Sequence, residues 1–267
     1  MCKVQLILSI VIIIAAVVVA APEGRIIGGE VVDPWKHPYI VSIRYKESVN
    51  STSLHRCAGV VYSQQVVITS AQCIVPYAHF ERIYVKAAGN TRTGVDGQLY
   101  PVKKWISHEK YSVWTADYDI GVLILEEPFN FKNLVIHPIA IRNSLPSAGK
   151  MATIAGWGYR EEFGPSSYNL EETQVPIVSS ADCNNIYKVS GDEVTERMIC
   201  AGYVATGGKD ACQGDTGGPL VVDDELVGLV SWGRGCARPG YPTVYSLVKS
   251  YVTWIDNTIA AEINKIN

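Results

Sequence analysis

Short apolar runs recur along most of this chain, and residues that favour turns separate them. The runs are rich in valine, isoleucine, threonine and tyrosine, whereas glycine, proline, asparagine and serine lie between them. Examples of such runs are residues 39–43, 60–62, 66–69, 120–125, 151–155 and 226–231. Short strands at this spacing predict an antiparallel sandwich or barrel, so we expect an all-β fold.

Only the end of the chain has apolar residues at helical spacing. In the stretch 249–263 they are Val252, Ile255, Ile259 and Ile263. This period predicts a C-terminal α-helix. No repeat, low-complexity linker or sharp change of composition divides the chain.

The N-terminal segment has the pattern of a secretory signal. Lys3 precedes an apolar stretch at 6–19, and Val18 and Ala20 place small residues at a cleavage site. The competing interpretation is a transmembrane anchor, but the apolar stretch is shorter than the roughly 20 residues that span a bilayer. We therefore expect residues 1–20 to be a signal peptide and the protein to be extracellular.

Composition and charge are those of an ordinary globular protein. Of the 267 residues, 48% are hydrophobic and 18% are charged, whereas a disordered chain is poorer in apolar residues and more strongly charged. The formal net charge is only −3, and no basic stretch marks a nucleic-acid or membrane surface. Neither a nucleic acid nor a membrane is expected as a partner.

Cysteine usage and a glycosylation sequon both fit an oxidising, extracellular compartment. The cysteines are Cys2, Cys57, Cys73, Cys183, Cys200, Cys212 and Cys236. Cys2 leaves with the signal, and the even remainder indicates disulfides whose pairing the count leaves open. A zinc site would need closely spaced cysteine pairs, which are missing here, so we expect no metal and no cofactor. The sequon at Asn50 permits N-glycosylation.

Four motifs follow one another along the chain, with two shorter ones among them. They are 25–29 (RIIGG), 69–73 (TSAQC), 117–121 (DYDIG) and 208–219 (GKDACQGDTGGP), together with 156–158 (GWG) and 231–233 (SWG). This set resembles the trypsin/chymotrypsin family of serine proteases over residues 26–263. The 208–219 motif is very specific, whereas RIIGG alone is a weak signal.

The resemblance implies a fold, a division of the chain and a disulfide pairing. The family fold consists of two antiparallel six-stranded β-barrels, with the active site between them and a C-terminal α-helix. Residues 21–25 would be a short propeptide, and 26–267 the trypsin-like domain, with the barrels divided near residue 136. The implied disulfides are Cys57–Cys73, Cys183–Cys200 and Cys212–Cys236.

The resemblance places Gln72, Asp119 and Thr216 at the catalytic positions. Serine-protease chemistry needs a hydroxyl nucleophile, a base that takes its proton and a buried carboxylate that orients the base. Asp119 matches the carboxylate, and Ser231 matches the residue that supports it. Gln72 stands at the base position, yet an amide cannot hold a proton near neutral pH. Thr216 keeps a hydroxyl but adds a methyl that crowds the attack, so we expect a degenerate triad without catalytic function.

A second histidine could in principle replace the missing base. The candidates are His37, His55, His79, His108 and His137. His55 lies two residues before Cys57 and is interpreted as structural. His79 follows Gln72 by seven residues and would need an unusual path into the cleft. We interpret all five as surface or core histidines.

The substrate pocket implied by the resemblance combines matching and departing residues. Asp210 matches the carboxylate that gives trypsins their preference for arginine and lysine, and Gly233 matches one wall. Thr243 stands where a trypsin has glycine. Its β-branched side chain is expected to narrow the pocket and to screen Asp210, as in elastase-like relatives.

Two other family features match in this sequence. Gly214 and the backbone N–H of Thr216 correspond to the oxyanion hole, which survives the loss of side chains. Arg25–Ile26 matches the activation bond, and Asp215 matches the carboxylate that pairs with the new N-terminal amine. Whether this bond is cleaved or never processed remains open at this stage.

These matches and departures favour a secreted pseudoprotease that acts by binding proteins. Details at 156–159 (GWGY), 198–200 (MIC) and 235–238 (GCAR) resemble mite trypsins of the group 3 allergen type and the inactivated protease paralogues of the scabies mite. That resemblance implies partners in protease cascades or in host defence such as complement. The alternatives are a weak trypsin- or elastase-like endopeptidase that uses Thr216, and a decoy that titrates protease inhibitors.

Overall fold

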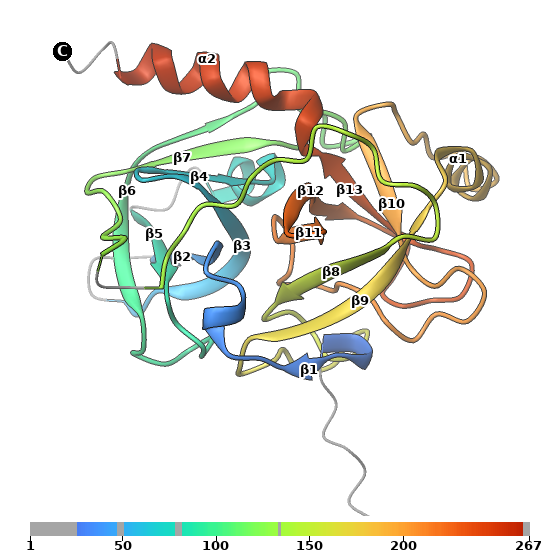
Figure 1. The fold of residues 1–267 in the computed structure, drawn as a ribbon, viewed down its shortest axis with the longest axis horizontal. Coiled ribbons are helices and arrows are strands. Elements are labelled where there is room, and N and C mark those ends of the chain that lie inside the picture. Colours follow the sequence, from blue (N-terminus) through green and yellow to red (C-terminus); the bar gives the residue numbers. More distant parts are fainter. Residues whose placement is uncertain (1–25, 47–50, 78–81, 133–134, 264–267) are drawn as a thin grey trace, which may run out of the picture.

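The computed structural model describes residues 26–46, 51–77, 82–132 and 135–263. The expected signal peptide, the propeptide with Arg25, the sequon at Asn50 and His79 lie outside these residues. Two β-barrels stand side by side, and a helix lies along one edge (Figure 1). The fold is the expected all-β, chymotrypsin-like one, with two closed six-stranded antiparallel barrels and a C-terminal helix.

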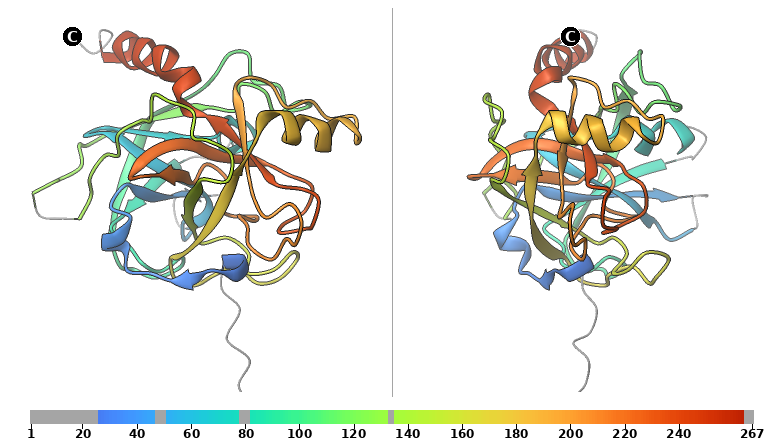
Figure 2. Two further views of the ribbon diagram at one scale, coloured as in Figure 1. Left: turned by 45° about the vertical axis from the view of Figure 1, so that its right-hand side comes forward. Right: turned by 90° about the vertical axis from the view of Figure 1, so that its right-hand side faces the viewer.

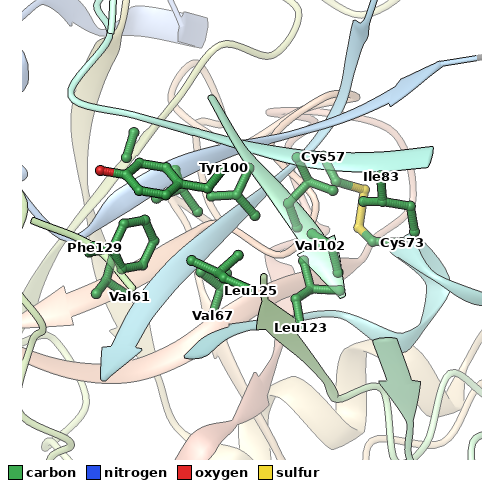
Figure 3. Close-up of a cluster of buried hydrophobic side chains, with 14 of the residues drawn as sticks. Cys57, Val61, Val67, Cys73, Ile83, Tyr100, Val102, Leu123, Leu125 and Phe129 are labelled. Atoms are coloured by element: carbon green, nitrogen blue, oxygen red, sulfur yellow. A yellow bond between two sulfur atoms is a disulfide. The ribbon is translucent and has the colours of Figure 1, made fainter. Parts of the chain in front are cut away.

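The first barrel closes in the order β2-β3-β4-β7-β6-β5. Its strands are β2 (Ile40–Lys46), β3 (Leu54–Ser63), β4 (Val66–Thr69), β5 (Arg82–Ala87), β6 (Gln98–Ser107) and β7 (Gly121–Leu125). Alternate side chains point inward and form a core that runs from the Cys57–Cys73 disulfide at one end to Tyr100 and Phe129 at the other (Figure 3).

The second barrel closes because β8 pairs with both β9 and β11. Its strands are β8 (Met151–Gly156), β9 (Glu171–Val178), β10 (Met198–Ala201), β11 (Pro219–Val222), β12 (Glu225–Trp232) and β13 (Thr243–Leu247). The short strand β1 (Glu30–Val31) adds to β9 from outside the ring. Residues 126–150 connect the two barrels.

The strands β4 and β7 are apolar except for Thr69 at the end of β4, because each strand is buried on both faces. Val67 and Leu123 point into the first barrel, whereas Ile68 and Val122 face the second barrel. There they pack with residues of β11 and β12 and with the C-terminal helix. This packing brings the ends of strands from both barrels to one cleft.

Two α-helices are present among the described residues: α1 (Ser180–Lys188) and α2 (Val252–Ile263). The C-terminal helix α2 was expected, and it lies at the edge opposite β1 in the turned views as well (Figure 2). The sequence pattern missed α1, which Ser179 caps by accepting a hydrogen bond from Asp182 N. A short helix needs such a cap and tertiary support, and the disulfide from Cys183 supplies the support.

Five 3-10 segments complete the described elements. They are Ile26–Gly28, Pro34–Lys36, Ala71–Cys73, Val75–Tyr77 and Val248–Tyr251. The three implied disulfides are all present. In the part of the chain described above, no helix is long and apolar enough to cross a membrane.

Candidate active site

The three triad positions meet between the barrels, each at the end of a strand. Gln72 lies in the 3-10 turn that follows β4, and Asp119 lies two residues before β7. Thr216 lies in the turn that precedes β11, and its carbonyl accepts a hydrogen bond from Ala58 N of the first barrel at 2.9 Å. The fold therefore brings together the three residues that the sequence motifs predict at the catalytic positions.

Asp119 is fully buried, and its carboxylate accepts four hydrogen bonds. The donors to its carboxylate are the hydroxyls of Ser231 (2.6 Å) and Ser70 (2.9 Å), with the backbone N–H (2.9 Å) and side-chain amide (2.6 Å) of Gln72. Burial raises the pKa of Asp119 above its ordinary value, and the donors oppose that rise. Sequence reasoning missed Ser70, although the residue lies inside the 69–73 motif.

The side-chain amide of Gln72 joins the two barrels. Its Nε2 donates to Asp119 Oδ2 at 2.6 Å and to the carbonyl of Ser231, on β12, at 2.8 Å. Because an amide nitrogen carries two hydrogens, both are then engaged. Gln72 thus reproduces the contact of a base with its orienting carboxylate, but it has no nitrogen lone pair to offer to a hydroxyl.

The hydroxyl of Thr216 has no hydrogen-bond partner among the described residues. Thr216 lines a cavity of about 190 Å³ and is partly exposed. A nucleophilic hydroxyl needs a base within about 2.6–3.2 Å. The described part of the chain supplies none.

Each described histidine is engaged elsewhere. His55 bonds Ser42 Oγ at 2.8 Å and the carbonyl of Gly214 at 3.0 Å, so both ring nitrogens are occupied. His37 bonds Glu172 at 2.6 Å. His108 stacks on Trp254, with ring centroids 4.7 Å apart. His137 is exposed, and its ring lies against that of Phe131 in the connection between the barrels.

Backbone donors stand next to Thr216. The N–H groups of Gly214 and Thr216 have no acceptor among the described residues. Gly214 has φ +102°, a conformation that favours glycine. The carbonyl of Gln213 accepts from Tyr159 N at 2.9 Å, which orients the Gly214 N–H to the opposite side of that peptide. This arrangement can bind a carbonyl oxygen or an anion.

Thr243 covers Asp210 at the base of the cavity beside Thr216. The Thr243 hydroxyl donates to Asp210 Oδ1 at 2.7 Å, and the backbone N–H of Ala237 donates to Oδ2 at 2.8 Å. Thr243 and Gly233 line the cavity, whereas Asp210 is not among its lining residues. Burial raises the pKa of Asp210 to about 6. A cationic side chain therefore has no direct access to this carboxylate.

Asp215 is buried without a cationic partner among the described residues. Its carboxylate accepts from Gly158 N at 2.8 Å and from Cys212 N at 3.0 Å. Burial raises its pKa to about 7. Ile26 is joined to Arg25 in this chain, so no free amine exists, and Ile27 lies against the loop of Asp210 through its carbonyl.

A family model described as Trypsin matches residues 26–255, that is, both barrels and the first turn of α2. The chain belongs to the trypsin family of serine proteases. The similarity to known relatives covers most of this chain and most of each relative. Trypsin zeta of Drosophila melanogaster is 39% identical over 247 residues, which cover 90% of this chain and 88% of that protein.

Two further relatives match the trypsin homologue to a similar extent. Trypsin of Simulium vittatum is 40% identical over 231 residues, covering 85% of this chain and 90% of its own. The vitellin-degrading protease of Bombyx mori is 37% identical over 238 residues, which cover 88% of this chain and 86% of that protein. No group of histidine, cysteine or acidic side chains suited to a metal occurs in the described ranges.

Proposed function

We propose that this trypsin homologue is a secreted pseudoprotease that acts by binding other proteins. The observation that carries the proposal is the arrangement of Gln72, whose amide donates both hydrogens to Asp119 and Ser231 and leaves the Thr216 hydroxyl without a base. The oxyanion-hole donors and the cleft remain, so the protein keeps a surface that can bind other proteins even without hydrolysis.

The size of the catalytic loss supports this interpretation. In subtilisin, which carries the same triad on another fold, removing triad members lowers the rate by about 10⁴ to 10⁶, and the residues act as a unit. Here two of the three positions differ from those a serine protease requires. Residual hydrolysis at that level would not sustain a digestive or regulatory protease.

The expected partners are proteins of the extracellular space. The apolar N-terminal segment has the pattern of a secretory signal, and three disulfides suit an oxidising compartment. The sequence resemblance to mite group 3 trypsins and to scabies mite inactivated protease paralogues favours components of protease cascades or of host complement as partners.

Two alternatives are less well supported. A weak endopeptidase that uses Thr216 would need a base near its hydroxyl. An inhibitor-titrating decoy would need a pocket that admits arginine or lysine, and the Thr243 hydroxyl occupies Asp210 there. The decoy is therefore weaker for inhibitors that insert a basic side chain.

The decisive experiment measures hydrolysis of fluorogenic arginine, lysine and small-residue peptides by protein with an Ile26 N-terminus. We expect no turnover by the wild type. The Gln72→His, Thr216→Ser double mutant serves as the control that restores both groups. Activity in the double mutant alone would show that the missing base and nucleophile account for the loss.

Turnover by the wild type that Thr216→Ala abolishes would overturn the proposal in favour of the altered mechanism. If neither the wild type nor the double mutant turns over the peptides, the substrate pocket must contain a further obstacle to hydrolysis. Adding Thr243→Gly to the double mutant then tests whether uncovering Asp210 restores cleavage after arginine and lysine.

A further inference from the structure

A second cavity, of about 250 Å³, lies where the two barrels meet. His55, Arg56 and Arg92 of the first barrel line it on one side. The second barrel contributes Trp157, Tyr159, Ser166, Gln213 and Gly214. Gln213 also lines the cavity beside Thr216, so the two cavities adjoin, yet the second one is separate from Asp210 and Thr243.

The wall of this cavity carries positive charge and no described carboxylate. Neither Arg56 nor Arg92 forms an ion pair within the described residues. Behind them lies Arg44, 4% exposed, whose guanidinium donates to the hydroxyl and carbonyl of Ser53 and to the carbonyl of Arg92. All three acceptors are uncharged, so the charge of Arg44 is not neutralised by its own contacts.

The nearby acidic residue is already engaged. Asp96 pairs with Lys86 at 2.7 Å and accepts the backbone N–H groups of Asn90 and Thr91. Burial, and then the neighbouring Arg92, lower the pKa of Arg44. The cavity is thus a region of positive potential in a protein whose net charge is −3.

Arg92 is held in place by the opposite barrel. Its backbone N–H donates to the carbonyl of Tyr168 at 2.6 Å, and its Nε donates to the carbonyl of Ser167 at 3.1 Å. The neighbouring Asn90 carbonyl accepts from Trp157 Nε1 at 2.7 Å. These bonds leave the terminal nitrogens of Arg92 for a ligand, and a pre-ordered guanidinium loses little entropy when it binds a carboxylate.

His55 completes the wall as a neutral side chain. The Gly214 carbonyl can only accept, so His55 Nε2 carries the hydrogen and Nδ1 accepts from Ser42. Burial lowers the pKa of His55 to about 3, and the charges of Arg44, Arg92 and Lys86 contribute to the same direction. Gly214 lines the same cavity, and its backbone N–H has no acceptor among the described residues.

We propose that this cavity binds the carboxylate of an aspartate or glutamate side chain presented by a protein partner, with Arg56 and Arg92 as the charged donors. The inference rests on the proposed protein-binding function and gives it a chemical preference. A single side chain suits a cavity below the roughly 300 Å³ of small-molecule sites. Polyanion binding would require an extended basic track, which the two arginines do not form.

The test is an NMR titration of the uncleaved full chain labelled with ¹⁵N in arginine and glycine. The probes are capped glycyl-glutamyl-glycine amide and its glutaminyl counterpart, which differ in charge alone. We expect the glutamyl probe to shift the Gly214 amide and the Arg92 Nε–H signals saturably, with an affinity about tenfold above that of the glutaminyl probe.

Variants then assign the effect to the cavity. Arg56→Gln removes an exposed side chain with no described bond, so folding is preserved, and the affinity for the glutamyl probe should fall about tenfold. The matched control is Arg82→Gln on β5, which is also exposed and has no side-chain partner among the described residues, and which should leave the affinity unchanged.

Equal affinities for the two probes would overturn the proposal, as would an unchanged affinity in Arg56→Gln. Binding of a heparin fragment that shifts these signals when the glutamyl probe does not would also overturn it, in favour of a polyanion. The titration is independent of the activity assay because the probes contain no basic residue. Turnover of fluorogenic peptides would refute the pseudoprotease yet leave this result standing.

Discussion

At the scale of the single residue, Gln72 separates two tasks that one imidazole performs in an active triad. Imidazole donates a hydrogen bond to the buried carboxylate and also carries a proton to and from the nucleophile. The amide of Gln72 performs the first task at 2.6 Å from Asp119 and lacks the means for the second. The hydrogen bonding that orients the site is thereby preserved, while the amide offers the Thr216 hydroxyl no base.

The role of the amide predicts the effect of two substitutions on stability. Gln72→Ala removes one of the three donors to Asp119 Oδ2 and the side-chain donor to the Ser231 carbonyl, and it should lower the free energy of unfolding by about 1–3 kcal/mol. Gln72→Glu places a second carboxyl beside Asp119, so the pair must share a proton. The shared pKa is then raised in the folded state, and stability is lost as the pH rises.

Urea unfolding of the wild type, Gln72→Ala and Gln72→Glu at pH 5 and pH 8 checks this prediction. We expect Gln72→Glu to be the less stable of the two variants at pH 8 and to recover part of the loss at pH 5. Gln174→Glu, on an exposed position of β9, is the control and should show no such pH dependence. Equal behaviour of the two glutamate variants would contradict the prediction.

At the scale of the element, the loop 89–97 depends on one buried ammonium group. Lys86, at 4% exposure on β5, donates to the carbonyls of Thr91 and Gly94 and to the carboxylate of Asp96. Burial raises the pKa of Asp96, but the bonds from Lys86 and Thr91 outweigh it and bring the value to about 2. The loop that positions Arg92 is thus organised around this cation.

We expect Lys86→Met to lower the free energy of unfolding by about 2 kcal/mol, since it leaves partly buried acceptors unpaired. The control is Lys104→Met, which removes the more exposed pair with Glu262 and should cost less than about 1 kcal/mol. Urea unfolding gives both values, and hydrogen exchange should show faster exchange in residues 89–97 in Lys86→Met alone. Equal losses in the two variants would contradict this role.

The elements differ in how far the sequence reveals them. The strands β4 and β7 are readable because their continuous apolar runs reflect burial on both faces. The helix α1 cannot be predicted in this way, because its stability comes from a cap and a disulfide rather than from regularly spaced apolar residues. The positions of Gln72, Asp119 and Thr216 follow from the motifs, whereas their hydrogen bonds do not.

Contacts between residues far apart in the sequence limit how much of the site can be predicted from the sequence alone. The amide of Gln72 donates to the carbonyl of Ser231, which is 159 residues away in the sequence. Arg92 donates to the carbonyl of Ser167, which is 75 residues away. Neither residue carries a local pattern that marks its partner. The three-dimensional arrangement alone supplies the inter-barrel bond and the cationic cavity.

At the scale of the whole molecule, the buried Asp215 links stability to pH and to cleavage. Its folded pKa, raised to about 7, means that the native state binds more protons than the unfolded state between about pH 4 and 7. This contribution to stability is therefore present at low pH and is lost as the pH rises. The amine released at Ile26 would supply the missing cation.

Asp215→Asn isolates this contribution because asparagine does not titrate. The stability of the uncleaved wild type relative to Asp215→Asn should fall between pH 4 and pH 8, by roughly 1.4 kcal/mol per unit of pKa displacement. Thermal unfolding across this range measures the difference. In protein cleaved after Arg25 the fall should disappear, and its persistence would show that the new amine does not reach Asp215.

The two altered triad positions also govern the mutational route back to proteolysis. Glutamine and histidine codons differ by one nucleotide, as do codons for threonine and serine, so each reversion is a single step. Since triad residues act as a unit, neither step alone yields activity on which selection can act. Under the proposed function, a lineage that carries both Gln72 and Thr216 gains little hydrolysis from either single reversion, so selection acts on the protein as a recognition surface.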